Sequence, residues 1–174
     1  MSTLTNYVKK SDASIFYLFN KKLHCNFLNI LMGNITHLGS VVFAVIFPLI
    51  FIIWPKYEVR KIGIDLALNL FLSQAIVHSI KRLVRRPRPY KILKKVLAVN
   101  PPSCKYSFPS GHTNAAFVLT FVLAYHMSSL ALLFLLLASL VGLSRIYLGF
   151  HYPTDVFIGV IIAYLSYTVY FKII

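Results

Sequence analysis

Five apolar stretches that carry almost no charge constrain this chain more than any other feature of its sequence. A helix crosses the hydrocarbon core of a bilayer with about 20 residues, and with somewhat fewer where flanking side chains reach the interface. The mean hydropathy of +0.73 and the presence of only four acidic residues among 174 are both unlike an ordinary soluble domain. The sequence therefore predicts one all-α domain over residues 1–174, a polytopic transmembrane helical bundle with about five spans. The stretches are residues 38–54, 62–80, 113–128, 129–143 and 156–171.

The third and fourth stretches meet at Ser128 and Ser129 with no charge between them. This joint allows either one very long helix or a tight helical hairpin. We expect the hairpin, because two short passes return Arg145 to the side of the bilayer that holds His112, whereas one long pass does not.

The first 37 residues differ from the rest because they mix lysines with apolar side chains. Lys9, Lys10, Lys21 and Lys22 flank an apolar run that is too short for the core of a cleaved signal peptide. The pattern over residues 11–33 is typical of an interfacial helix that leads into the first span, and the alternative is a solvated tail. A sixth span here would bury two lysines in mid-membrane, which is costly.

Three polar clusters follow one another along the chain, and each supplies part of a phosphate site. They bring fixed cations, then backbone N–H donors beside a histidine, then a second histidine with a carboxylate four residues further on. Five spans put all three clusters at one face of the membrane, whereas one crossing more or fewer between them would separate them. The clusters are Lys81 with Arg88-Pro89; Pro109-Ser110-Gly111-His112; and Ser144-Arg145 with His151 and Asp155.

The second cluster immediately precedes an apolar stretch, so Ser110 stands where a helix N-cap belongs. The free N–H groups of Gly111 and His112, with the helix dipole behind them, form an anion site. Gly111 also lets a phosphate approach the backbone closely. The alternative is a capped helix start with a solvent-facing histidine.

The third cluster combines His151 with Asp155. Pro153 suits the first position of a helix, so Asp155 falls in the first turn, where its carboxylate can reach back to the ring of His151. There it would fix the tautomer and stabilise an imidazolium. Arg145 adds another fixed cation. The alternatives are helix capping by Asp155 and, for the other cations of residues 81–95, anchoring to anionic headgroups.

The three clusters together resemble the signature of the type 2 phosphatidic acid phosphatase superfamily. Its pattern is Lys, six residues, Arg-Pro; then Pro-Ser-Gly-His; then Ser-Arg, five residues, His, three residues, Asp; every part matches over residues 81–155. The resemblance implies a lipid phosphatase that uses no metal and no cofactor. It implies that His151 attacks phosphorus to form a phosphohistidine, with Asp155 supporting it, and that His112 protonates the leaving group. The residues implied to hold the phosphoryl group are Lys81, Arg88, Ser110, Gly111 and Arg145.

A lipid phosphate is the expected substrate, because a site at the ends of membrane helices receives a headgroup while the tail stays in the bilayer. Phosphatidylglycerophosphate, undecaprenyl diphosphate, phosphatidic acid and lipid A 1-phosphate all remain candidates. Two other functions stay open: a phosphotransferase with the same intermediate, and a non-catalytic protein that binds anionic lipids. No nucleic-acid partner is expected, because the net charge of +14 crowds a membrane boundary without a binding motif. The oligomeric state stays open.

Two arguments disagree about which side of the membrane the site faces. With five spans, 14 of the 18 Lys and Arg side chains fall on the active face and four on the other, which favours the cytoplasm. The resemblance favours a bacterial cytoplasmic (inner) membrane protein whose site faces the periplasm or exterior, and we adopt this side. Cys25 and Cys104 both fall on the active face; free thiols are expected, and a disulfide between them is the alternative.

Overall fold

A computed structural model describes residues 2–98, 101 and 104–173. In this part of the chain the regular structure is helical, apart from one isolated β-bridge that pairs Pro87 with Tyr106. The helices are α1 (Ser2–Tyr17), η1 (Leu18–Lys22), α2 (Asn26–Ile35), η2 (Thr36–Gly39), α3 (Val41–Ile52), α4 (Tyr57–Val84), α5 (Pro89–Ile92), α6 (Gly111–His126), η3 (Ser128–Leu130), α7 (Ala131–Tyr147) and α8 (Pro153–Ile173).

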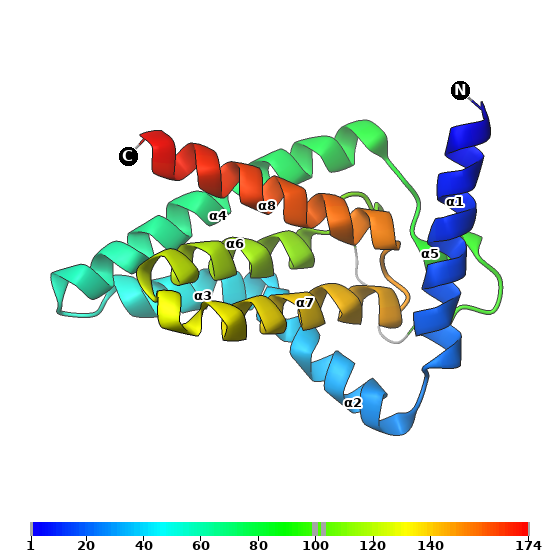
Figure 1. Ribbon diagram of the computed structural model, residues 1–174, viewed down its shortest axis with the longest axis horizontal. Coiled ribbons are helices and arrows are strands. Elements are labelled where there is room, and N and C mark those ends of the chain that lie inside the picture. Colours follow the sequence, from blue (N-terminus) through cyan, green and yellow to red (C-terminus); the bar gives the residue numbers. More distant parts are fainter. Residues whose placement is uncertain (1, 99–100, 102–103, 174) are drawn as a thin grey trace.

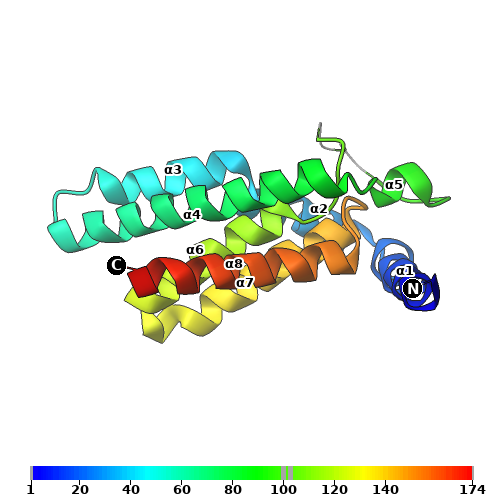
Figure 2. The same ribbon diagram turned by 90° about the horizontal axis from the view of Figure 1, so that it is seen from above.

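All five apolar stretches are helical, which confirms the all-α prediction. Helices α3, α4, α6, α7 and α8 run side by side, and α1 lies across one end of this bundle (Figures 1 and 2). After the short η3 turn, α7 packs back against α6, so the predicted helical hairpin is also confirmed. The C-terminus lies at the end of the bundle opposite to α1 (Figure 1).

Helix length and composition give three to four candidate membrane crossings. By length and composition α4, α8 and residues Ser128–Tyr147 can each cross a membrane, and the bent pair of Asn26–Gly39 and Val41–Ile52 makes a fourth candidate with a 55° bend. Helix α6 has only 16 residues, or about 24 Å against a hydrocarbon core of about 30 Å. The structure therefore supports an integral membrane bundle with three to four candidate spans, and the count of five stays a prediction.

The outer surface of the bundle is apolar, as lipid contact requires. Phe71 of α4, Leu132 of α7 and Phe157 of α8 are all largely exposed. Extensive exposed apolar surface marks a membrane-facing or partner-facing side of a protein. Together with the candidate spans, it supports the integral membrane assignment.

The N-terminal segment differs from the single interfacial helix expected over residues 11–33. The helix ends after η1, and Cys25 has an extended backbone before α2 begins. Tyr147 of α7 holds this break: its hydroxyl accepts from the Cys25 N–H (3.3 Å), lies 2.6 Å from Asn29 Oδ1, and its ring stacks on His24 with centroids 5.1 Å apart. Because Tyr147 lies 122 positions further along the chain, the sequence near Cys25 gives no sign of this interruption between η1 and α2.

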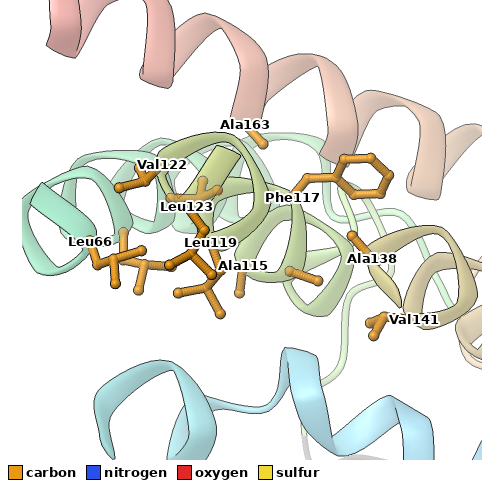
Figure 3. Packing of buried hydrophobic residues seen from close by; sticks show 12 residues of the cluster. Leu66, Ala115, Phe117, Leu119, Val122, Leu123, Ala138, Val141 and Ala163 are labelled. Atoms are coloured by element: carbon orange, nitrogen blue, oxygen red, sulfur yellow. The ribbon is translucent and has the colours of Figure 1, made fainter. Parts of the chain in front are cut away.

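Helix α6 forms the centre of the core, because α4, α7 and α8 all pack against it. Ten of its 16 residues are buried, so its apolar positions follow no single-face period. Figure 3 shows Leu119, Val122 and Leu123 of α6 beside Leu66 of α4, with Ala163 of α8 nearby. Van der Waals packing of this kind stabilises helix pairs in lipid, where apolar burial between helices gives little free energy.

Polar side chains tie three of the helices together. Asn114 of α6 donates from Nδ2 to the carbonyl oxygen of Gly159 in α8 (3.2 Å). Near the other end of the bundle, Asp65 of α4 accepts from the Tyr170 hydroxyl (2.9 Å) and pairs with Nε2 of His126 (2.8 Å). Asp65 and His126 are therefore structural partners at this end of the bundle.

Gly159 allows α8 to approach α6 closely. A Cβ atom at this position would lie 2.8 Å from the carbonyl oxygen of Ser110. We expect Gly159→Ala to lower the free energy of unfolding by about 1–3 kcal/mol, which corresponds to about 2–4 °C per kcal/mol in melting temperature. Gly33→Ala is the control, because a Cβ there meets nothing within 4 Å. Equal melting temperatures of the two variants in detergent would contradict this packing.

Candidate active site

The three polar clusters meet at one end of a cavity of about 500 Å³ that is walled mainly by α3, α4 and α6. This end lies where α4 finishes, α6 begins, α7 finishes and α8 begins, close to α1 (Figure 1). The convergence expected from a common membrane face is therefore confirmed. The cluster residues that line the cavity are Lys81, Arg88, Gly111, His112, Arg145 and His151.

Three buried cations dominate the electrostatics of this end of the cavity. Lys81, Arg88 and Arg145 are 8%, 3% and 3% exposed. Among the residues that the structure describes, none of the three forms an ion pair with a carboxylate, and Nε of Arg145 has no hydrogen-bond partner. Burying like charges without a counter-charge is costly, so the site is built to receive an anion.

Neutral acceptors hold the two guanidinium groups in place. Arg88 donates from Nε to the carbonyl oxygen of Cys104 (2.8 Å) and from Nη1 to that of Phe150 (3.1 Å). Arg145 donates from Nη1 to the hydroxyl of Thr36 (2.6 Å), and its guanidinium lies 4.7 Å from the centre of the Phe150 ring. Because these partners are uncharged, they fix the geometry of the cations without cancelling their charge.

His151 presents a lone pair to the cations. Its Nε2 lies 3.3 Å from Nη1 of Arg88, and because a guanidinium can only donate, Nε2 is the acceptor and Nδ1 carries the proton. Burial, reinforced by the charges of Arg88, Arg145 and Lys81, holds the pKa of His151 well below its ordinary value. The imidazole is therefore neutral at physiological pH, with its lone pair directed at the place where an anion would bind.

Asp155 faces the other nitrogen of the same ring. Its Oδ2 lies 3.5 Å from Nδ1 of His151, which is longer than a hydrogen bond. The same oxygen accepts from the Tyr152 N–H (2.9 Å), while Oδ1 accepts from Nη1 of Arg86 (2.7 Å). The carboxylate thus has a fixed orientation, and a small approach would complete its contact with His151.

The start of α6 matches the predicted helix cap. The Ser110 Oγ accepts from the Thr113 N–H (3.4 Å) and lies 2.8 Å from the Thr113 hydroxyl, which confirms Ser110 as the N-cap. Gly111 and His112 line the cavity, so the first turn of the helix faces it. The Ser110 hydroxyl is committed to the cap, and the phosphate contact expected of it stays a prediction.

Three polar residues near the site were not assigned to it from the sequence. Thr36 binds Arg145, and Arg86 joins Asp155 to Asp12 of α1. Arg86 precedes Pro87 just as Arg88 precedes Pro89, and Asp12 is one of only four acids in the chain. Both facts were available signals, whereas nothing in the sequence distinguishes Thr36.

Two further expectations concern thiols and metals. Cys25 and Cys104 are both exposed, and the structure shows each as a free cysteine. In the residues that the structure covers, no group of three or more His, Cys, Asp or Glu side chains has the arrangement of a metal site.

Comparison with known proteins identifies the family. A model of the PAP2 superfamily matches residues 62–174, which include all three clusters. An undecaprenyl-diphosphatase from Sulfolobus acidocaldarius is 32% identical over 103 residues; the match covers 58% of this chain but only 49% of the relative, about half its length. Phosphatidylglycerophosphatase B from Bacillus subtilis is 33% identical over 146 residues, with 76% of this chain and 68% of the relative covered.

A solved structure agrees with these relatives. The crystal structure of Aquifex aeolicus LpxE superposes with a TM-score of 0.79 at 28% sequence identity, covering 92% of this chain and 94% of the other. The family and the two relatives named as phosphatases support a phosphoric ester hydrolase. Because the family model matches well over half of the chain, the protein belongs to the PAP2 superfamily.

Proposed function

We propose that this protein is a membrane lipid phosphatase that hydrolyses a phosphomonoester or diphosphate of a lipid through a phosphohistidine intermediate on His151. One observation carries the proposal: three buried cations, which form no ion pair with any carboxylate in the described part of the chain, surround a neutral histidine whose lone pair faces them. A phosphate supplies the missing negative charge, and its phosphorus atom is the electrophile that such a lone pair attacks.

Binding would prepare the nucleophile. In the unliganded site Nη1 of Arg88 donates to Nε2 of His151. A phosphate oxygen is a stronger acceptor for a guanidinium than an imidazole nitrogen is, so substrate would take over this donor and free the Nε2 lone pair. Lys81, Arg145 and the N–H groups at the start of α6 would hold the remaining oxygens.

The reaction would then proceed in two displacements. Nε2 of His151 forms a bond to phosphorus while the bond from phosphorus to the leaving oxygen breaks. His112 would take up a proton from water when the bound phosphate offsets the charges of the nearby cations, and it gives that proton to the leaving oxygen. Water then attacks phosphorus, gives a proton back to His112, and the P–N bond breaks to release inorganic phosphate. The fixed cations stabilise the oxygen charge in both transition states, and we propose that they do so without a metal ion.

The remainder of the cavity suits a lipid tail. Beyond the cations it is lined by apolar side chains, among them Val45 and Leu49 of α3 and Leu70 and Phe71 of α4. A prenyl or acyl chain would fill this part while its phosphate meets the cations. The names of the two relatives suggest undecaprenyl diphosphate and phosphatidylglycerophosphate, with phosphatidic acid and lipid A 1-phosphate as the other candidates.

We propose five crossings of a bacterial inner membrane, with the whole chain as one domain and the site on the outer face. Helix α6 crosses as a short span because other helices enclose it. The excess of Lys and Arg on the active face favours a cytoplasmic site, but this argument is weaker because several of these side chains are held in or beside the site: Lys81, Arg86, Arg88 and Arg145. Helix α1 would lie in the membrane interface.

Replacement of His151 tests the catalytic role. We expect the native protein in detergent with excess chelator to release phosphate from at least one of the four lipids, and His151→Ala to release none, because the nucleophile is gone. His37→Ala is the control, since His37 is exposed and lies outside the cavity lining. No release by folded native protein, or transfer of labelled phosphate to an acceptor alcohol in preference to water, would contradict the proposal.

The two cysteines test the orientation, because both are exposed at the active end of the bundle. With Cys104→Ser, only Cys25 remains, and we expect a membrane-impermeant maleimide to label it in intact bacterial cells. Tyr57→Cys in a chain lacking both native cysteines is the control, since Tyr57 is exposed at the α3–α4 turn. Labelling of position 57 but not of Cys25 would place the site in the cytoplasm.

A further inference from the structure

One face of the N-terminal helix is buried against the active site. Asp12, Phe16 and Asn20, spaced four residues apart, are 2%, 0% and 0% exposed. The Phe16 ring lies 6.1 Å from the ring of Tyr152, the neighbour of His151. Asn20 donates from Nδ2 to the carbonyl oxygen of Tyr147 at 2.7 Å. Helix α1 therefore contacts the segment between α7 and α8 that carries His151.

Both carboxylate oxygens of Asp12 are fully engaged. Oδ1 accepts from the Thr154 N–H (3.0 Å), and Oδ2 accepts from the Thr154 hydroxyl (2.6 Å) and from Nη2 of Arg86 (2.7 Å). Thr154 immediately precedes Asp155 in α8. Asp12 thus binds the start of α8 directly, and binds Arg86 at the same time.

Arg86 connects this contact to the carboxylate that faces His151. Its Nη1 donates to Oδ1 of Asp155 (2.7 Å) and to the hydroxyl of Thr154 (2.8 Å), and its guanidinium lies 4.0 Å from the centre of the Tyr152 ring. Because Oδ1 of Asp155 is held by Arg86, Oδ2 is left facing Nδ1 of His151. The guanidinium fork therefore sets the rotation of the carboxylate.

We propose that Asp12 and Arg86 are positioning residues for the reaction: through Asp155 they hold the imidazole of His151 in line with the substrate phosphorus. The inference rests on the proposed function. Asp12 lies outside residues 62–174, the part matched by the family model, so the N-terminal helix adds a component of the active site that the three clusters do not contain.

The charges of Asp12, Arg86 and Asp155 give a reason for the presence of two carboxylates. If Arg86 paired with Asp155 alone, the positive charge of Arg86 would cancel the negative charge of Asp155. With Asp12 on the other arm of the guanidinium, the three side chains carry a net charge of −1 beside Nδ1 of His151. That charge stabilises the positive ring that forms as the bond from Nε2 to phosphorus is made. Asp12 therefore acts on charge as well as on position.

Kinetics of Asp12→Asn and Arg86→Lys test the proposal with phosphatidylglycerophosphate or undecaprenyl diphosphate, whichever the native protein hydrolyses. We expect kcat to fall by about tenfold to a hundredfold, as a small misplacement of a reacting group does. KM and the inhibition constant of inorganic phosphate should not change, because neither residue lines the cavity that binds phosphate. Glu58→Gln and Arg85→Lys, at exposed positions, are the matched controls and should behave like the native protein.

The double variant Asp12→Asn/Arg86→Lys separates one shared network from two separate effects. If both residues act through Asp155, the kcat of the double variant should be no lower than the kcat of the more impaired single variant, because effects within one unit do not multiply. Multiplied losses would overturn the proposal. So would a native kcat in Asp12→Asn, or a loss of kcat accompanied by a higher KM and a lower melting temperature. If native protein releases no phosphate, the proposed function falls and this inference falls with it.

Discussion

The structure depends on keeping three buried cations together around one histidine. Lys81, Arg88 and Arg145 repel one another, and burial removes the water that would screen them. Backbone carbonyls and the hydroxyl of Thr36 hold the two arginines at fixed positions. Part of the folding free energy is therefore spent on holding these cations together, and in the proposed function they form an anion site that is ready before substrate arrives, as electrostatic catalysis requires.

The arrangement of helices delivers this site to a single end of the bundle. The C-terminal end of α4 supplies Lys81, that of α7 supplies Arg145, and the N-terminal ends of α6 and α8 supply His112 and Asp155 (Figure 1). An antiparallel α6–α7 hairpin is what returns Arg145 to His112. The positive ends of the α6 and α8 dipoles face the same region, so helix direction and side-chain charge both favour an anion there.

The sequence was sufficient for the helices and for the meeting of the three clusters, because apolar runs and fixed spacings are local patterns. It was not sufficient for the contacts that α1 makes. Asp12 meets Thr154 across 142 positions of sequence, and the break at Cys25 depends on Tyr147. Such contacts leave no periodic trace. For the Ser110 hydroxyl the local pattern predicted the helix cap correctly. The same hydroxyl was also expected to contact phosphate, and its bond to the Thr113 N–H competes with that contact.

In the proposed reaction phosphorus forms a covalent bond to His151, and detection of that bond tests the mechanism directly. Native protein would be mixed with substrate carrying radiolabelled phosphate, quenched in alkali within milliseconds, and digested. We expect an alkali-stable, acid-labile label on the peptide that contains His151. A label on another residue, or a burst of released phosphate with no labelled peptide, would contradict it.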